Sequence, residues 1–149
     1  MYEKCAFTGH RILERDFDFN VLDRVIYNLI RGGTKYFYCG MATGFDMAAA
    51  ESVISHKKDF EISLIACIPC PEQDKSYSAK NKERYKRILE NCSEVTVLSE
   101  EYFDGCMQVR DRYLVDTCDV LIAYKRRNRG GTVYTVNYAK SKGVNIIEI

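Results

Sequence analysis

Short apolar runs alternate with segments of helical period along the chain. The runs are rich in β-branched and aromatic residues, whereas the other segments place apolar side chains three and four positions apart, as Leu22, Val25 and Ile26 do. Strands are therefore expected at 4–8, 36–40, 62–68, 95–98, 120–124 and 144–149. Helices are expected between them at 19–31, 43–56, 77–92, 106–118 and 132–142. This order predicts an α/β fold with a mostly parallel sheet of about six strands and helices on both faces.

Local side-chain patterns refine three of the expected helices. Thr43 and Asp46 have the spacing of a capping box, with Asp in place of the usual Glu. Arg112 and Asp116 stand four residues apart and are interpreted as a surface ion pair. The cations of the helix at 77–92 fall away from its apolar stripe, so we interpret them as a solvated face rather than a nucleic-acid surface.

Composition and charge narrow the classes of function. The 149 residues are 46% hydrophobic and 29% charged, which predicts one soluble globular domain over residues 1–149. The net charge of +1 lacks the positive excess that is typical of proteins that bind DNA or RNA, so we do not expect nucleic acid to bind. No apolar run approaches the length that spans a bilayer, and the first residues lack the regions of a signal peptide. The protein is therefore expected in the cytoplasm, away from membranes.

Seven cysteines, an odd number, are most compatible with a reducing compartment. Cys67 and Cys70 form a C-x-x-C pattern, but Pro69 and Pro71 favour extended chain over the helix start that lowers the pKa of a redox thiol. We interpret the two residues as unpaired thiols at a strand end. With only two histidines in the chain, no metal site is expected.

Ligands of open parallel sheets bind at the carboxyl ends of the strands, so the segments that follow each strand carry the candidate chemistry. Glycines, hydroxyls and cations gather there. The segments are Thr8-Gly9-His10-Arg11, Gly40 to Asp46, Pro69 to Gln73, and Lys125 to Thr132.

Two of these segments have the composition of phosphate cradles. Gly130-Gly131-Thr132 opens a helix, where backbone N–H groups, a hydroxyl and the helix dipole favour an anion. Gly40-x-x-x-Gly44 also joins a strand to a helix, and Asp46 follows it as an acceptor for a ribose hydroxyl or as a helix cap. Each glycine pair alone is also compatible with a tight turn that holds no ligand. Neither matches a Walker loop or the Gly-x-Gly-x-x-Gly fingerprint.

Arg110 lies on the apolar stripe of its helix, near the helix start. A buried guanidinium needs an anionic partner, which is either a ligand or one of Asp46, Glu72 and Asp104. Aromatic residues near the same edge are candidates for stacking on a base or for the core. They are Tyr102, Phe103 and Tyr124.

Five segments in order resemble the SLOG superfamily, named for the Smf/DprA and LOG proteins, and in particular its YpsA-like branch of small bacterial proteins. They are Phe7 to Arg11, Gly40 to Glu51, Ile68 to Gln73, Met107 to Asp116, and Gly130-Gly131-Thr132 with Tyr138-Ala139. The resemblance covers nearly the whole chain. It implies a Rossmann-like domain that binds a nucleotide or nucleotide derivative, such as an adenine, ADP-ribose-like or NAD-related compound, requires no cofactor, and often forms a dimer.

The same resemblance brings two alternative functions. LOG enzymes cleave nucleoside monophosphates with an Arg in a Met-x-x-Arg-Lys segment and a Glu after a longer glycine loop. Here Asp111 replaces that Lys, and Thr135 stands about where the Glu would be, so we expect weak or absent hydrolysis. DprA proteins bind single-stranded DNA and a recombinase; their additional domains have no counterpart here, and the near-neutral charge does not favour DNA.

A sensor-type domain with a nucleotide ligand is the function expected from these patterns together. Catalysis, if any, is assigned to Arg110, Asp46 or Glu72. The expected ligand-binding residues are Thr8, Gly9, His10, Arg11, Gly40, Thr43, Gly44, Asp46, Gln73, Arg110, Arg129, Gly130, Gly131 and Thr132.

Overall fold

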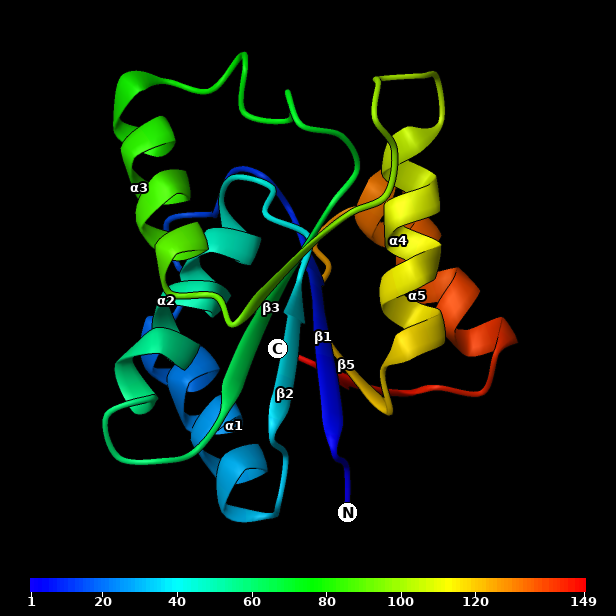
Figure 1. The fold of residues 1–149 in the computed structure, drawn as a ribbon. Helices are drawn as coiled ribbons and strands as arrows, with labels where there is room; N and C mark the ends of the chain where they lie inside the picture. Colours follow the sequence, from blue (N-terminus) through cyan, green and yellow to red (C-terminus); the bar gives the residue numbers. More distant parts are fainter.

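Six strands and five helices alternate without exception along the chain (Figure 1). The computed structural model describes every residue from Met1 to Ile149. In order, the elements are β1 (Lys4–Gly9), α1 (Phe19–Arg31), β2 (Tyr36–Cys39), α2 (Phe45–His56), β3 (Ser63–Ile68), α3 (Ala79–Glu90), β4 (Glu94–Val97), α4 (Cys106–Thr117), β5 (Val120–Tyr124), α5 (Gly131–Ser141) and β6 (Asn145–Glu148). All strand pairs are parallel. The predicted fold class is confirmed, and the architecture is Rossmann-like.

The strand order is β4-β3-β2-β1-β5-β6. From β1 the chain winds outward to β4 along one side of the sheet. It then returns through α4 to place β5 against the other side of β1, where Phe7 is in register with Ile122. The winding direction therefore reverses between β1 and β5. In open α/β sheets such a reversal leaves a crevice at the carboxyl ends of the strands.

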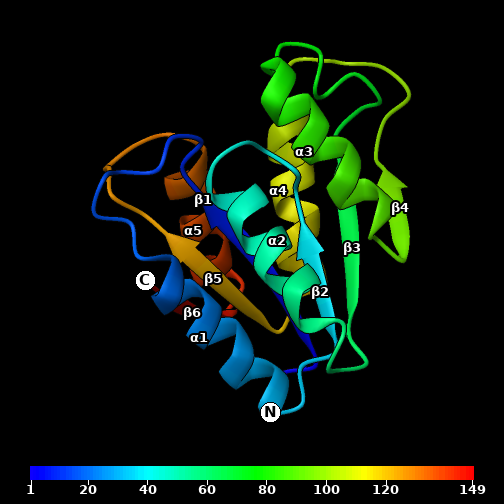
Figure 2. The ribbon, with the colours of Figure 1, turned by 90° about the vertical axis from the view of Figure 1, so that its left-hand side faces the viewer.

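Helices cover both faces of the sheet. Helices α1, α2 and α3 lie on one face, and α4 and α5 lie on the other (Figures 1 and 2). Successive residues of β1 point to opposite faces: Phe7 belongs to the core beneath α1–α3, whereas Ala6 belongs to the core beneath α4 and α5. The central strands are apolar on both sides because each side is covered.

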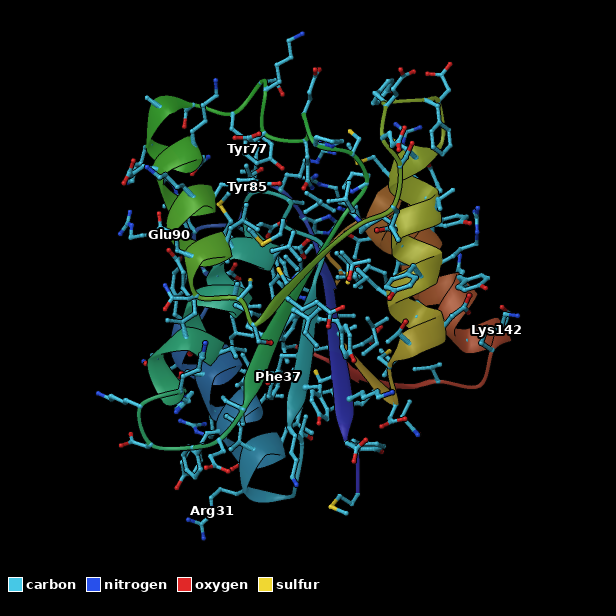
Figure 3. The ribbon with its side chains drawn as sticks, viewed as in Figure 1. Arg31, Phe37, Tyr77, Tyr85, Glu90 and Lys142 are labelled. Carbon is cyan, nitrogen blue, oxygen red and sulfur yellow. The ribbon has the colours of Figure 1, made fainter.

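Two helices begin later than the sequence predicts. The capping box is wrong: α2 begins at Phe45, and Gly44 at its N-cap provides no side chain. The Asp46 carboxylate accepts instead from the Ala42 N–H at 3.2 Å, so it orders the loop rather than the helix end. Helix α3 begins at Ala79 because Ser78 caps the Asn81 N–H. Tyr77 lies before this helix and packs against Tyr85 (Figure 3).

The surface of α4 also departs from expectation. Arg112 does not pair with Asp116. It donates to the Tyr134 hydroxyl at 2.6 Å, and Asp116 accepts from the Tyr138 hydroxyl at 2.9 Å. Both side chains thus connect α4 to α5, because the neighbouring helix offers partners that an isolated helix lacks.

None of the five helices combines the length and apolar composition that crossing a bilayer requires. All seven thiols are free, Cys67 and Cys70 among them.

Candidate functional site

A cleft of about 520 Å³ opens at the carboxyl ends of β1 and β5, where the winding direction reverses. This volume lies in the range of small-molecule sites. Four segments line it: the loop after β1, the start of α2, the start of α4 and the loop that leads into α5. The lining residues are Phe7, Thr8, Gly9, His10, Arg11, Ile12, Ala42, Asp46, Tyr102, Gly105, Cys106, Met107, Gln108, Arg110, Asp111, Arg127, Arg129, Gly130, Gly131 and Thr132.

Arg110 lies on the floor of the cleft and is 5% exposed. Its Nε donates to Asp111 Oδ1 at 2.8 Å, and its Nη1 donates to the Gly40 carbonyl at 2.6 Å. The predicted carboxylate partners were Asp46, Glu72 or Asp104, and these are wrong. Asp111 forms the ion pair instead, because it follows Arg110 directly in the chain, in the first turns of α4.

Asp46 is the other buried charge of the floor, at 6% exposure. Burial raises the pKa of its carboxyl to about 7, although the Arg110 guanidinium and the Ala42 N–H act in the opposite direction. For Arg110, burial by itself lowers the pKa, but the nearby Asp111 and Asp46 carboxylates outweigh it and raise the pKa above its ordinary value. The guanidinium therefore stays charged, and the Asp46 carboxyl exchanges its proton near neutral pH.

The start of α5 forms one wall of the cleft. Gly130 has φ +111°, a conformation that favours glycine, and it places Gly131 and Thr132 at the first turn. A Cβ added at Gly130 or Gly131 would meet no atom within 4 Å, so this turn is open. The first amides of a helix have no intrahelical acceptor. With Arg127 and Arg129 beside them, they make this wall electropositive.

The glycines after β2 lie in a different setting. A Cβ at Gly40 would stand 2.9 Å from Arg110 Cδ, and one at Gly44 would overlap the Arg11 carbonyl. Gly44 also has φ +75°. These two glycines let Arg110 and the loop after β1 pack closely, and neither lines the cleft.

His10 joins the loops after β1 and β5. Its Nε2 lies 2.8 Å from the Arg126 amide nitrogen and accepts its hydrogen, so in the neutral ring the proton is on Nδ1. Burial lowers the pKa of His10, and the positive charge of Arg127 lowers it further. The ring packs edge-on against Tyr124, which is buried in the core rather than available to a base.

The structure brings together most, but not all, of the residues that the sequence singles out. Thr43, Gln73 and Glu72 lie outside the cleft lining. Gln73 uses its amide to bind the Gly40 carbonyl at 2.8 Å and the Tyr85 hydroxyl at 3.1 Å, which makes it a structural link in the loop after β3. Glu72 is exposed.

Sequence reasoning did not select several residues of the cleft as ligand contacts. Asp111 was visible as a departure from the LOG pattern, and Tyr102 as an aromatic near the edge. Met107 belonged to the Met-x-x-Arg segment but was not selected as a ligand contact, and Gly105, Cys106 and Gln108 were not selected either, because their contribution depends on where α4 crosses the sheet.

Known proteins resemble this chain in both sequence and fold. The family model described as "YspA SLOG family" matches residues 18–146. The uncharacterized SPbeta prophage-derived protein YoqJ of Bacillus subtilis (strain 168) is 35% identical over 130 residues, covering 78% of this chain and 76% of that protein. A UPF0398 protein of Bacillus licheniformis is 28% identical over 123 residues, covering 80% of this chain and 67% of that protein.

Two solved structures share the fold. DNA processing protein A (DprA) from Streptococcus pneumoniae has a TM-score of 0.76 and 21% identity over 99% of this chain. DprA from Helicobacter pylori, whose structure concerns single-stranded DNA binding, has a TM-score of 0.75 and 20% identity over 97% of this chain. The chain spans about half the length of the first protein and 64% of the second.

Proposed function

This chain belongs to the YpsA-like SLOG family, and from that premise we propose that its cleft binds a nucleotide or a nucleotide derivative. The function is that of a binding domain of the sensor type. It rests on one observation above the others: the first turn of α5 lines the cleft, and a Cβ added at either of its glycines would meet no atom within 4 Å.

An anion is the ligand that this wall favours. The unpaired amides at the start of α5 point along the helix axis toward its N-terminal end, where the helix dipole adds partial positive charge. Arg127 and Arg129 are exposed and line the same side. A phosphate group is expected here, and Tyr102, which lines the cleft and is 64% exposed, offers a face for a base.

Thermal unfolding in the presence of AMP, ADP-ribose, NAD and nucleotide sugars tests the proposal. A compound at 100 times its dissociation constant adds about 2.7 kcal/mol to the free energy of unfolding. For a chain of this size, that raises Tm by roughly 5–10 °C. If no phosphate-bearing compound raises Tm, the proposal is wrong.

A substitution at the start of α5 links the effect to this wall. Gly131→Leu fills the open first turn, and the free space around Gly131 lets the protein fold with the larger side chain. We expect the ligand-induced shift to disappear while Tm without ligand stays near that of the parent protein. Asn137→Leu is the matched control, because it adds the same side chain at an exposed position of the same helix; its ligand-induced shift is expected to persist.

Single-stranded DNA is a second candidate ligand, because exposed cations and aromatics meet at the rim of the cleft. Arg11, Arg127 and Arg129 are exposed and line it, and Tyr102 and Phe103 are exposed on the segment before α4. Cationic grooves with aromatic stacking faces bind single strands without sequence preference. The overall charge had argued against nucleic acid, whereas the local arrangement and the DprA-like fold favour testing it.

Fluorescence anisotropy with a labelled oligothymidine at increasing salt tests this candidate. Binding through phosphates weakens steeply with salt, and Tyr102→Ala removes stacking of about 1–3 kcal/mol per base. Tyr36→Ala is the control, because Tyr36 is a partly exposed tyrosine at the start of β2, at the other end of the sheet. Weak binding that hardly responds to salt excludes a DNA function and leaves the nucleotide proposal in place.

A further inference from the structure

Positive groups line one wall of the cleft, whereas both carboxylates of the cleft lie on its floor. The wall at the start of α5 carries helix amides with Arg127 and Arg129, and the floor carries Asp46 and Asp111 around Arg110. Asp111 pairs with Arg110 at 2.8 Å, so the one cation of the floor is already matched. Asp46 lies close enough for its charge to affect Arg110 as well. A second phosphate on this floor would therefore meet carboxylates rather than a free cation.

Asp46 keeps one oxygen available to a ligand. Its Oδ2 accepts from the Ala42 N–H, and its Oδ1 has no partner within the protein. The structure contains no buried side-chain oxygen or nitrogen without a hydrogen-bond partner, so the unpartnered Oδ1 is not fully enclosed by protein, and Asp46 lines the cleft. The same reasoning applies to Asp111, whose Oδ1 is held by Arg110 and whose Oδ2 has no partner within the protein.

Neutral hydroxyl donors suit this floor better than an anion or a metal ion. A carboxylate accepts hydrogen bonds through both oxygens, and each bond from a donor to a charged acceptor is stronger than a neutral one. The residues also do not form a cluster that could hold a metal ion. In a nucleotide, the sugar joins the phosphate to the base. A phosphate at α5 and a base near Tyr102 would bring the sugar above the floor between them.

We propose that the cleft selects 5′-phosphorylated ribose compounds over their 2′-deoxy counterparts, with the Asp46 carboxylate accepting a hydrogen bond from the ribose 2′,3′-hydroxyl pair. Asp111 contributes a second acceptor while it holds Arg110 in place. This inference rests on the nucleotide-binding function proposed above and narrows it to ribonucleotides.

Calorimetric titration of the full chain with AMP and with 2′-deoxy-AMP tests the selection. A hydrogen bond to a charged group is worth about 10- to 100-fold in affinity, so AMP is expected to bind about 10- to 100-fold more tightly. Asp46→Asn keeps the shape of the side chain and an acceptor for the Ala42 N–H, but removes the charge. The ratio between the two ligands should fall to about threefold or less in this variant.

Asp104→Asn is the matched control, because it removes a carboxylate from the segment beside the cleft without changing its lining. A change in overall charge acts on both ligands alike, so the ratio should stay that of the parent protein. Equal binding of AMP and 2′-deoxy-AMP by the parent protein overturns the ribose selection and leaves nucleotide binding intact. An unchanged ratio in Asp46→Asn overturns the role of Asp46. If neither nucleotide binds, the inference fails, and the thermal survey of other phosphate compounds decides the broader proposal separately.

Discussion

Two strand-to-helix loops of this protein each carry a pair of glycines, but the surroundings of the two pairs are opposite. The loop between β2 and α2 holds Gly40 and Gly44, and the loop between β5 and α5 holds Gly130 and Gly131. In the first loop, a Cβ would collide with Arg110 or with the Arg11 backbone. In the second, a Cβ would meet nothing within 4 Å. The first pair permits close packing, whereas the second leaves a helix start open to the cleft.

The difference shows what a glycine pair can and cannot indicate. Glycine is used both where another backbone approaches closely and where a positive φ is needed. Only the tertiary neighbours decide whether the space beside it belongs to the protein or to a ligand. The β2–α2 loop therefore acts on the site indirectly. The Gly40 carbonyl accepts hydrogen bonds from Arg110 and Gln73, and the loop leads into the first turn of α2, which holds Asp46.

The largest effect should come from filling the packed loop. Gly44→Ala would force a side chain onto a residue with φ +75° and into the Arg11 carbonyl. We expect a loss of at least about 3 kcal/mol in the free energy of unfolding, because positive φ and a backbone collision add. Urea denaturation measures it. Gly131→Ala, in the open loop, is the comparison and should change stability by less than about 1 kcal/mol; similar losses in both variants would contradict the contrast.

A smaller loss is expected at Gly40. Its Cβ would stand 2.9 Å from Arg110 Cδ and 3.0 Å from Arg110 Cζ, and a side chain yields more easily than a backbone carbonyl. Gly40→Ala should cost about 1–3 kcal/mol, the range of overpacked sites, as measured by urea denaturation. Because the displaced Arg110 lies on the floor of the cleft, the affinity for AMP should fall as well. Unchanged stability together with unchanged affinity would show that Arg110 moves aside without consequence.

Asp46, in the first turn of α2 after the packed loop, predicts a pH effect on stability. The pKa of Asp46 is about 7 in the folded protein against an ordinary value of 3.8. The folded state therefore holds a proton that the unfolded chain releases, so this contribution to stability is present below pH 4 and is lost as pH rises toward 7. Asp46→Asn cannot titrate, and it should become more stable relative to the parent protein by about 2–3 kcal/mol between pH 5 and pH 8.

Urea denaturation of both proteins at pH 5 and pH 8 provides the measurement. Other titrating groups are common to the two chains, so they cancel in the difference between them. A stability difference that stays the same at both pH values would mean that Asp46 is ionised throughout.

Periodicity was sufficient to predict the fold. Every expected strand and helix exists. The spacing of apolar residues alone distinguishes strands, as in the apolar run 120–124, from helices, as in the amphipathic segment 19–31. Element ends were less predictable. Helix α2 starts at Phe45 rather than Thr43 because the loop before it packs on Arg11, a neighbour that is distant in sequence.

For the candidate site, the sequence predicted the edge of the sheet at which it lies, but not which residues line it. The rule that ligands bind where parallel strands end located Thr8 to Arg11 and Arg129 to Thr132, which all line the cleft. The same rule selected Gln73, whose amide is instead consumed by Gly40 and Tyr85. Partners from other elements decide whether a polar side chain is hydrogen-bonded within the protein or is available to a ligand. A local sequence pattern does not show these partners.

The smallest effect is expected in an assay of nucleotide hydrolysis, and it follows from how the two loops divide the chemistry. Cleaving the N-glycosidic bond builds positive charge on the ribose, which a carboxylate stabilises and which needs water oriented beside it. About where LOG enzymes carry their glutamate stands Thr135, within α5, whose hydroxyl donates to the Gly131 carbonyl at 2.9 Å and is buried. Of the two carboxylates of the floor, Asp111 pairs with Arg110, and Asp46 lies in the first turn of α2, after the packed loop, where burial raises its pKa to about 7. We therefore expect release of adenine from AMP, followed by chromatography, to be indistinguishable from that in buffer alone. General acid–base assistance is worth roughly 100- to 10,000-fold, so a catalytic carboxylate would be plain in this assay. Robust turnover that Arg110→Ala and Asp46→Asn both abolish, while Asp104→Asn retains it, would contradict the prediction and make the packed loop the catalytic one.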